Sequence, residues 1–299
     1  WGTKPFFQTV DFKYFKDPTA LNNALLTGTI NVIGTVQAPE SLTQFTSNPK
    51  YEVIEGTTNG EVVLSFNDGK APFTDKRVRQ AVRYAIDHKA LVDTCWAGRG
   101  MLIGSMVPPT DPWYEDLTGL YPHDVAKAKS LLTEAGKSGV TLRLRIPNLP
   151  YAVSCGQVVK SQLEQAGLKV NLDQLEFPAA WLTTVFKNAD YDMSIIAHVE
   201  PRDMGAVFGN PDYYTRYNNP AFQRALKAAD EGTQAQQVDE MKKAARLLSE
   251  TAAPAWLLLI PHQMIADKQL PCTRIHSIPT QFPLYPHYEP ASPFVLHSS

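Results

Sequence analysis

Hydrophobic and polar positions divide the chain into a β-rich beginning and a longer α/β segment. Near the start, three apolar residues alternate with polar ones, a period that predicts a strand buried on one face; they are Val10, Phe12 and Tyr14. Asp17, Pro18 and Gly28 then stand where a helix cap, a first turn and a left-handed stop are favoured. Further strands are predicted at 29–34, 51–55 and 61–66. Residues 1–67 are therefore predicted to be mainly β.

A helical period follows Thr74, a residue type that suits an N-cap. The apolar positions of this helix recur at helical spacing, and they are Val78, Ala81, Val82, Ala85 and Ile86. Basic residues occupy the other positions and are interpreted as a solvated face; they are Lys76, Arg77, Arg79 and Arg83. A second helix is predicted from Asp124 to Gly136.

Beyond residue 136 the predicted elements alternate between strands and helices. They are a strand at 140–146, a helix at 157–166, a strand at 168–175, a helix at 178–187 and a strand at 193–197. This βαβαβ order implies parallel strands with right-handed crossovers. Two more helices, at 220–231 and 234–251, precede a last apolar strand near 257–260. The chain is therefore predicted to be α/β, with an α/β lobe at 68–255.

The junction between the two parts has the sequence FNDGKAPFTDKRVRQAVRYAIDHKAL, residues 66–91. A strand that leaves one lobe and is followed by Gly and Pro suits a crossover between lobes, and hinges are a few residues at the ends of elements. Asn67, Gly69 and Pro72 are therefore predicted hinge residues. The return crossover is predicted at 255–261, so that residues 256–299 lead back to the first lobe.

Composition excludes several classes of protein. The 299 residues are 43% hydrophobic and carry a formal net charge of −2, so the chain has no broad basic field for nucleic acid or anionic lipid. It has no apolar run long enough to span a membrane, and its first residues lack the pattern of a signal peptide. Cys95, Cys155 and Cys272 are widely spaced, which leaves open one disulfide or three packed thiols.

Four sequence blocks carry a resemblance to a known family. They are DPTALNNALLTGTINVI, the junction block quoted above, DVAKAKSLLTEAG and SQLEQAGLKVNL, and the junction block is the most specific of them. Over nearly its whole length the chain resembles the C-terminal part of family 5 extracellular solute-binding proteins, the dipeptide and oligopeptide receptors of ABC importers. The resemblance implies a two-lobed periplasmic-binding-protein-like fold (type II, cluster C), with residues 1–67 as part of the first lobe.

The resemblance also implies that an N-terminal part is absent from this chain. That part would hold a signal sequence, a lipid-carrying cysteine, the start of the first lobe and a small inserted domain. The implied protein is periplasmic or otherwise extracytoplasmic, anchored by that lipid, and monomeric once its N-terminal segment is present. It would capture a short peptide between its lobes and deliver it to the permease subunits of an ABC transporter, without a cofactor.

Candidate ligand-binding residues lie at strand ends, where open α/β lobes usually bind ligands. Asn148 and Tyr151 belong to a predicted rim loop, which an ordinary β-to-α turn would also explain. Trp181 offers either an aromatic face to a ligand or a side chain to the core. Asn59 and Gly60 precede the crossover strand, where the resemblance implies backbone contact with an extended ligand and where a hairpin turn is the alternative.

The densest polar cluster follows the strand at 193–197. It contains His198, Glu200, Arg202 and Asp203. The resemblance implies that one carboxylate here accepts the α-ammonium of a peptide, although His198 stands where the family usually has Trp. The anchor is left between Glu200 and Asp203, with Asp203 preferred because its shorter side chain loses fewer rotamers. A pair between Arg202 and a carboxylate that holds the loop is the alternative.

Two other functions fit the same residues. His198, Glu200 and Asp203, with the distant His262, offer zinc-type ligands for a metal-dependent hydrolase. Their spacing is not HExxH and the chain has no GxSxG motif, so the sequence predicts no enzyme and no resident metal. A receptor of the same fold for a metal chelate, haem or another non-peptide solute is the stronger alternative, because the fold does not fix the cargo.

Overall fold

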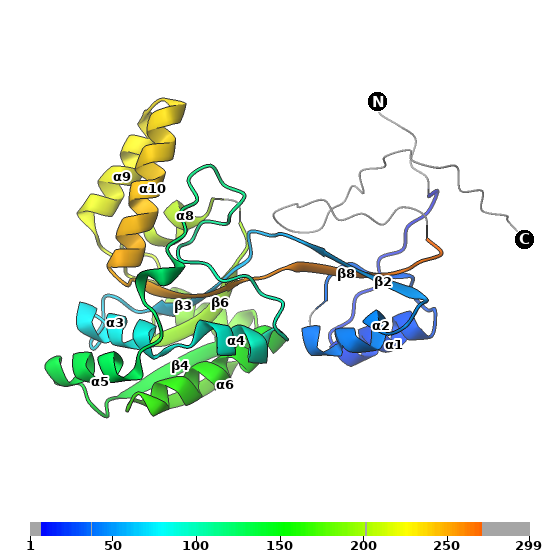
Figure 1. The fold of residues 1–299 in the computed structure, drawn as a ribbon, viewed down its shortest axis with the longest axis horizontal. Helices are drawn as coiled ribbons and strands as arrows, with labels where there is room; N and C mark the ends of the chain where they lie inside the picture. Colours follow the sequence, from blue (N-terminus) through cyan, green and yellow to red (C-terminus); the bar gives the residue numbers. More distant parts are fainter. Residues whose placement is uncertain (1–6, 37, 201, 271–299) are drawn as a thin grey trace, which may run out of the picture.

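The computed structural model describes residues 7–36, 38–200 and 202–270. Figure 1 shows two β-sheets, a larger one covered by helices and a smaller one, joined by two extended segments of the chain. The larger sheet has five strands in the order β5-β4-β6-β3-β7. Their bounds are β3 (Glu61–Phe66), β4 (Thr141–Pro147), β5 (Lys169–Leu175), β6 (Met193–His198) and β7 (Pro254–Leu259).

Strand directions in the larger sheet confirm the predicted βαβαβ order. β4 lies parallel to β5 and to β6, while β3 lies antiparallel to β6 and to β7. Helices cover both faces of this sheet, so β3 and β7 are buried along their whole length. The large core therefore has two layers, one on each face of the sheet.

One face of the larger sheet is covered by four helices, α3 (Lys76–Ala85), α4 (His88–Cys95), α5 (Val125–Glu134) and α6 (Pro150–Gln165). The other face carries α7 (Ala179–Trp181), the π-helix η3 (Leu182–Lys187), α8 (Met204–Phe208), α9 (Pro220–Glu231) and α10 (Gln234–Glu250). A loop with the short 3-10 helix η2 (Thr118–Leu120) packs on this second face. Figure 1 shows α9 and α10 as a projecting antiparallel pair.

Side-chain caps fix where several helices begin. Asp75, Asp87, Asp124 and Asn219 each accept a hydrogen bond from a backbone N–H in the first turn of the helix that follows. Such a cap satisfies one of the N–H groups that have no partner within the helix. Asp124 is the predicted start, whereas α3 is capped by Asp75 and begins one residue later than predicted.

The smaller sheet has the order β1-β8-β2, with bounds β1 (Val32–Ile33), β8 (His262–Asp267) and β2 (Tyr51–Gly56). Helix α1 (Pro18–Leu26), the 3-10 helix η1 (Pro39–Leu42) and α2 (Thr43–Thr46) pack against it. Asp17 caps α1, and Gly28 follows its end with a φ of 76°, as predicted. The core of this part is small, with Leu25, Leu42 and Phe45 at its centre.

The two sheets are linked at positions that differ from the prediction. β3 was expected in the first lobe, but it pairs with β6 and β7 in the larger sheet. The links are therefore residues 57–60, between β2 and β3, and residues 260–261, between β7 and β8. We propose these two links, rather than residue 67 and residues 255–256, as the domain boundaries.

The predicted hinge residues lie away from these links. Asn67, Gly69 and Pro72 follow β3, at the opposite end of that strand from the smaller sheet. The Asn67 side chain donates hydrogen bonds to the backbone oxygens of Ala189 and Tyr191, at 2.9 and 3.3 Å. These three residues therefore lie within the larger lobe, away from the two links, and their role as a hinge stays a prediction.

Two further local predictions are wrong. Residues 10–14 form no strand, and Val10, Phe12 and Tyr14 are 63%, 63% and 89% exposed. On α3, Lys76 and Arg77 are exposed as predicted, but Arg83 is buried. Helical periodicity locates an apolar stripe but does not show whether the residues beside it meet solvent or another part of the chain.

Of the two cysteine alternatives, the structure shows the disulfide. Cys95 of α4 and Cys155 of α6 are bonded, with their Cα atoms 4.9 Å apart. Cys272 lies outside the described residues. Within the described part of the chain, every helix is too short or too polar to cross a bilayer.

Candidate functional site

Polar side chains gather at the edge of the larger sheet that faces the link to the smaller sheet. Glu61 begins β3 and His198 ends β6, and the two residues are directly opposite each other in the antiparallel ladder. Residues opposite each other in such a ladder place their side chains on the same face of the sheet. Glu200 and Asp203 follow in the loop between β6 and α8.

His198 is held by a chain of hydrogen bonds. Its Nε2 atom lies 2.9 Å from the hydroxyl of Tyr214, and that hydroxyl lies 2.9 Å from Oγ of Ser65 on β3. The Tyr191 hydroxyl donates to the backbone oxygen of Tyr214 at 2.9 Å and so fixes the backbone beneath it. Burial lowers the pKa of His198 to about 4, with Glu200 acting weakly in the other direction. The imidazole is therefore neutral at pH 7.

Two carboxyl groups at this edge each have one buried oxygen without a hydrogen-bond partner among the described residues. Glu61 is 1% exposed and Asp203 is 4% exposed. Among the described residues, nothing donates to Oε2 of Glu61 or to Oδ2 of Asp203. Burial is the main cause that raises the pKa of both groups; the charge of Asp203 adds to it for Glu61, and that of Glu200 adds to it for Asp203.

Two further carboxylates complete this group. Glu200 is exposed, and its Oε2 atom accepts a hydrogen bond from the backbone N–H of Val199 at 3.1 Å. Asp111 comes from the loop between α4 and η2, and its charge acts on both Glu61 and Asp203. We call Glu61, Asp111, Glu200 and Asp203 the carboxylate cluster. With a neutral imidazole beside it, this cluster attracts cations.

Three of these residues are close enough to suggest metal binding. One ligand atom each from His198, Glu200 and Asp203 can be chosen so that all lie within 4.8 Å of one another. Imidazole nitrogen and carboxylate oxygen suit several divalent metals. The described residues offer no other group of three such ligands.

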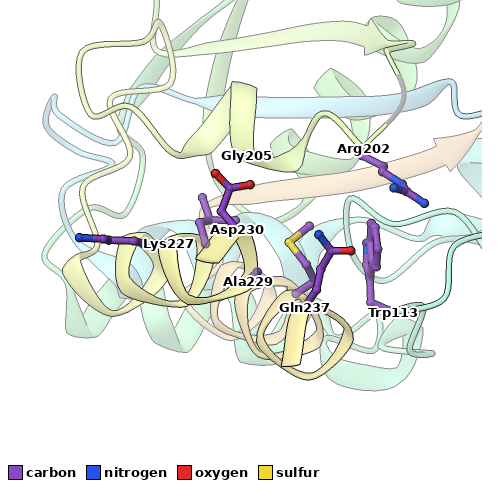
Figure 2. Close-up of a pocket in the computed structure, with 9 residues that line it drawn as sticks. Trp113, Arg202, Gly205, Lys227, Ala229, Asp230 and Gln237 are labelled. Atoms are coloured by element: carbon purple, nitrogen blue, oxygen red, sulfur yellow. The ribbon is translucent and has the colours of Figure 1, made fainter. Parts of the chain in front are cut away.

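Arg202 makes no ion pair among the described residues, although its charge acts on Asp111, so the alternative of a pair that holds the loop gains no support. Its guanidinium carbon lies 4.7 Å from the ring centroid of Trp113, a cation–π arrangement. The backbone of Arg202 has a φ of 58°. Figure 2 shows Arg202 and Trp113 together at one side of a cavity of about 440 Å³, which also reaches Gly205, Asp230 and Gln237. The positive charge of Arg202 therefore faces the ring of Trp113.

Three other predicted site residues have structural partners. Trp181 is 3% exposed, and its Nε1 donates to Oγ of Ser194 at 3.1 Å, so its ring belongs to the core. Tyr151 lies in the first turn of α6, which begins seven residues earlier than predicted, and its hydroxyl accepts from the N–H of Ala197 at 2.9 Å. Asn148 is exposed after β4, where its Oδ1 accepts from the N–H of Phe177 at 2.9 Å.

Asn59 and Gly60 lie in the link between the sheets rather than in a hairpin. The N–H of Gly60 donates to Oγ1 of Thr58 at 2.9 Å, and its carbonyl accepts from the N–H of Ile260 at 2.8 Å. A Cβ atom on Gly60 would lie 3.1 Å from that Thr58 oxygen and 3.4 Å from Cβ of Ile260. Glycine at position 60 therefore allows the two links to approach each other. The N–H and the carbonyl of Gly60 both have hydrogen-bond partners within the protein.

Four residues of the site were not predicted from the sequence: Glu61, Asp111, Ser65 and Tyr214. Glu61 had one available signal, because it is a lone acidic residue at the start of the buried run EVVLSF. The other three join the site only through contacts with residues far away in the sequence, which a local pattern does not show.

Comparison with known proteins identifies the family. Residues 1–219 match the sequence profile described as bacterial extracellular solute-binding proteins, family 5 (middle). The chain belongs to this family. The family is one of extracellular or periplasmic substrate-binding receptors of ABC importers.

Individual relatives differ in what their names say they bind. The chain is 29% identical over 192 residues to the nickel-binding periplasmic protein of Escherichia coli K12, covering 58% of this chain and 36% of that protein. It is 27% identical over 183 residues to the dipeptide-binding protein of the same organism, covering 59% and 34%. The chain thus spans about a third of the length of these curated relatives.

A solved structure supports the fold. NikA from Brucella suis, in complex with Fe(III)-EDTA, superposes with a TM-score of 0.81 at 18% identity, covering 93% of this chain and 61% of that one. The predicted two-lobed periplasmic-binding-protein-like fold is confirmed. At this identity the likeness concerns the fold alone.

Proposed function

We propose that the protein is a receptor that captures short peptides and delivers them to an ABC importer in the membrane. The observation that carries the proposal is the buried carboxyl of Asp203, whose Oδ2 has no partner among the described residues. A buried charge without a partner is costly, and the α-ammonium of a peptide would supply the missing one. The proposal extends to permease subunits as partners, a monomeric receptor and a lipid anchor.

Asp203 is a better anchor than Glu200 in this site. Asp203 is buried beside Glu61 and His198, whereas Glu200 is exposed and already accepts a hydrogen bond from the backbone. An ammonium at Asp203 loses its water and gains a carboxylate in an environment of low polarity, where their attraction is strong. An ammonium at Glu200 would remain in solvent, where ion pairs contribute little.

The Cys95–Cys155 disulfide agrees with this proposal. Disulfides persist in oxidising compartments such as the periplasm and the cell exterior, and they are rare in the cytosol. This supports the proposed extracytoplasmic location independently of the candidate site.

Calorimetry on the full protein that contains this chain tests the proposal. Asp203→Asn should weaken binding of a dipeptide such as alanyl-alanine by roughly thirtyfold to a few thousandfold, because breaking a buried charged pair costs about 2 to 5 kcal/mol. Glu200→Gln is the matched control and should do much less. Acetylation of the peptide's amino group should reproduce the loss in the wild type and add little in the Asp203→Asn variant. Normal binding of the acetylated peptide would remove the anchor.

The affinity for such a peptide should also depend on pH. The pKa of Asp203 is raised by burial, so its carboxyl binds a proton that an incoming ammonium must displace. Affinity should therefore rise as the pH is increased from about 5 to 8, and the binding heat should vary with the ionisation enthalpy of the buffer. A flat pH profile would show that no proton leaves the site on binding.

A receptor for a metal chelate is the second candidate. His198, Glu200 and Asp203 come within 4.8 Å of one another, and one of the similar proteins is named as nickel-binding. This candidate predicts that the purified protein carries a transition metal, or binds Ni²⁺ or a nickel chelate, and that His198→Ala abolishes the binding. Metal analysis and native mass spectrometry of freshly purified protein separate the two candidates.

A further inference from the structure

The carboxylate cluster contains more buried carboxyl groups than one ammonium group can pair with. Glu61 and Asp203 are both more than nine-tenths buried, and each has an oxygen without a partner among the described residues. A single α-ammonium paired with Asp203 acts on Glu61 through its charge, but Oε2 of Glu61 still needs a hydrogen-bond donor of its own. Glu61 therefore requires a second cation or a retained proton.

The described residues do not provide that second cation. Among the described residues, Arg202 is the basic side chain whose charge acts on the cluster, through Asp111. Its guanidinium lies over Trp113, as Figure 2 shows, and it makes no ion pair within the described part of the chain. His198 is neutral because it is buried, so it adds no positive charge.

The two buried carboxyls both belong to neighbours of His198. Glu61 is the ladder partner of His198, and Asp203 has a carboxylate oxygen within 4.8 Å of a ring nitrogen of His198. A ligand with two cationic groups separated by a short hydrocarbon stem matches this arrangement. The side chain of lysine or arginine at the first position of a peptide has such a stem beside the α-ammonium.

An aromatic group stands beside the cluster to contact that stem. The rings of Tyr213 and Tyr214 lie 5.2 Å apart, and Phe186 packs edge-on against Tyr213 at 5.1 Å. Phe186 is 39% exposed, so this aromatic group reaches solvent. The charges of Glu200 and Asp203 act on the Tyr213 hydroxyl, which places Tyr213 beside the carboxylates.

We propose that the site prefers ligands with two cationic groups at one end, such as peptides that begin with lysine or arginine, with the side-chain cation directed to Glu61. This inference rests on the proposed function and adds a substrate class to it. The α-ammonium would occupy Asp203, and Asp111 would lie at the entrance to the second position.

Three dipeptides test the inference by calorimetry on the full protein. Lysyl-alanine carries both cations, norleucyl-alanine has nearly the same stem without the second charge, and alanyl-lysine places the second charge elsewhere. Lysyl-alanine should bind about tenfold to a hundredfold more tightly than norleucyl-alanine, the range expected for one charged hydrogen-bonded pair. Alanyl-lysine should resemble norleucyl-alanine.

The variant Glu61→Gln keeps the shape of the side chain and removes its charge. It should bring the ratio of the lysyl-alanine and norleucyl-alanine affinities close to one. Asp212→Asn is the matched control, because the Asp212 side chain is 92% exposed and pairs with Arg216. That variant should keep the wild-type ratio.

The possible outcomes separate this inference from the proposed function. Equal affinities for lysyl-alanine and norleucyl-alanine, with acetylation still abolishing binding, would overturn the second cation position and leave the anchor at Asp203. A preference for lysyl-alanine that survives in Glu61→Gln would also overturn the role of Glu61. Absence of peptide binding, or normal binding of acetylated peptides, would overturn both.

Discussion

Two regions of the larger lobe bury charged side chains in opposite ways. On α3, Arg83 is buried with its Nη1 donating to the backbone oxygens of Ser249 and Pro254, each at 3.3 Å, and with its guanidinium 4.4 Å from the Tyr121 ring. At the carboxylate cluster, Glu61 and Asp203 each have a buried oxygen with no donor among the described residues.

The two regions differ in the role of their charged side chains: Arg83 has a structural role, and Glu61 and Asp203 are proposed to have a functional one. Arg83 joins α3 to the end of α10 and the start of β7, so its charge holds the fold together. The carboxyls of Glu61 and Asp203 hold no other element and destabilise the unliganded protein when they ionise. The contrast is between a guanidinium that donates to two backbone oxygens and carboxyl oxygens that have no donor among the described residues.

The largest expected effect comes from removing the structural charge. Arg83→Ala should lower the free energy of unfolding by about 3 kcal/mol, because two buried carbonyls lose a charged donor and the Tyr121 ring loses its cation. Urea unfolding measures the change. Arg77→Ala is the control on the same helix, where the side chain is 47% exposed, and it should change the stability by less than about 1 kcal/mol. Equal losses in the two variants would contradict the structural role of Arg83.

Removing a charge from the cluster should act in the opposite direction. Folding raises the pKa of Glu61, so the folded state keeps a proton that the unfolded chain releases above about pH 4.3. The stability of the unliganded protein therefore decreases as the pH rises from there toward neutral. Glu61→Gln avoids this loss and should stabilise the unliganded protein by about 1 to 3 kcal/mol at pH 7.5, with no gain at pH 4.

Urea unfolding at both pH values measures the effect of Glu61→Gln. Glu52→Gln, on the exposed side of β2, is the control and should leave the pH dependence unchanged. Destabilisation by Glu61→Gln at pH 7.5 would mean that Glu61 has a partner in the folded protein, and the contrast with Arg83 would disappear.

The smallest expected effect concerns the hydrogen-bond chain behind His198. Ser65→Ala removes one of the two partners of the Tyr214 hydroxyl and leaves the bond to His198. The free energy of unfolding should fall by about 1 kcal/mol, the usual net value of one hydrogen bond. A loss similar to that of Arg83→Ala would show that the chain is as important to the fold as the arginine.

Local pattern sufficed for most elements of the fold. The cap at Asp17, the helix begun by Asp124 and the βαβαβ order of the larger lobe all follow from residue types at fixed spacings, and the structure confirms them. The junction block, residues 66–91, also indicates the family by its sequence alone. Those features depend on residues that are close together in the sequence, and a sequence pattern records such residues directly.

Sheet membership and the site could not be obtained in this way. Whether β3 belongs with β2 or with β6 is decided by pairing across more than 100 residues, and this pairing places the links between the sheets at positions other than those predicted. His198, Glu200 and Asp203 were predicted as neighbours because they are close in the sequence.

Glu61 and Asp111 join those residues only in the folded chain, since β3 and the loop after α4 are brought to the same edge of the sheet. The sequence by itself determined which segments form helices and strands and which family the chain resembles. Only the tertiary structure decided which charged side chains are buried with a partner and which are buried without one, because burial and pairing depend on the segments that pack against each residue.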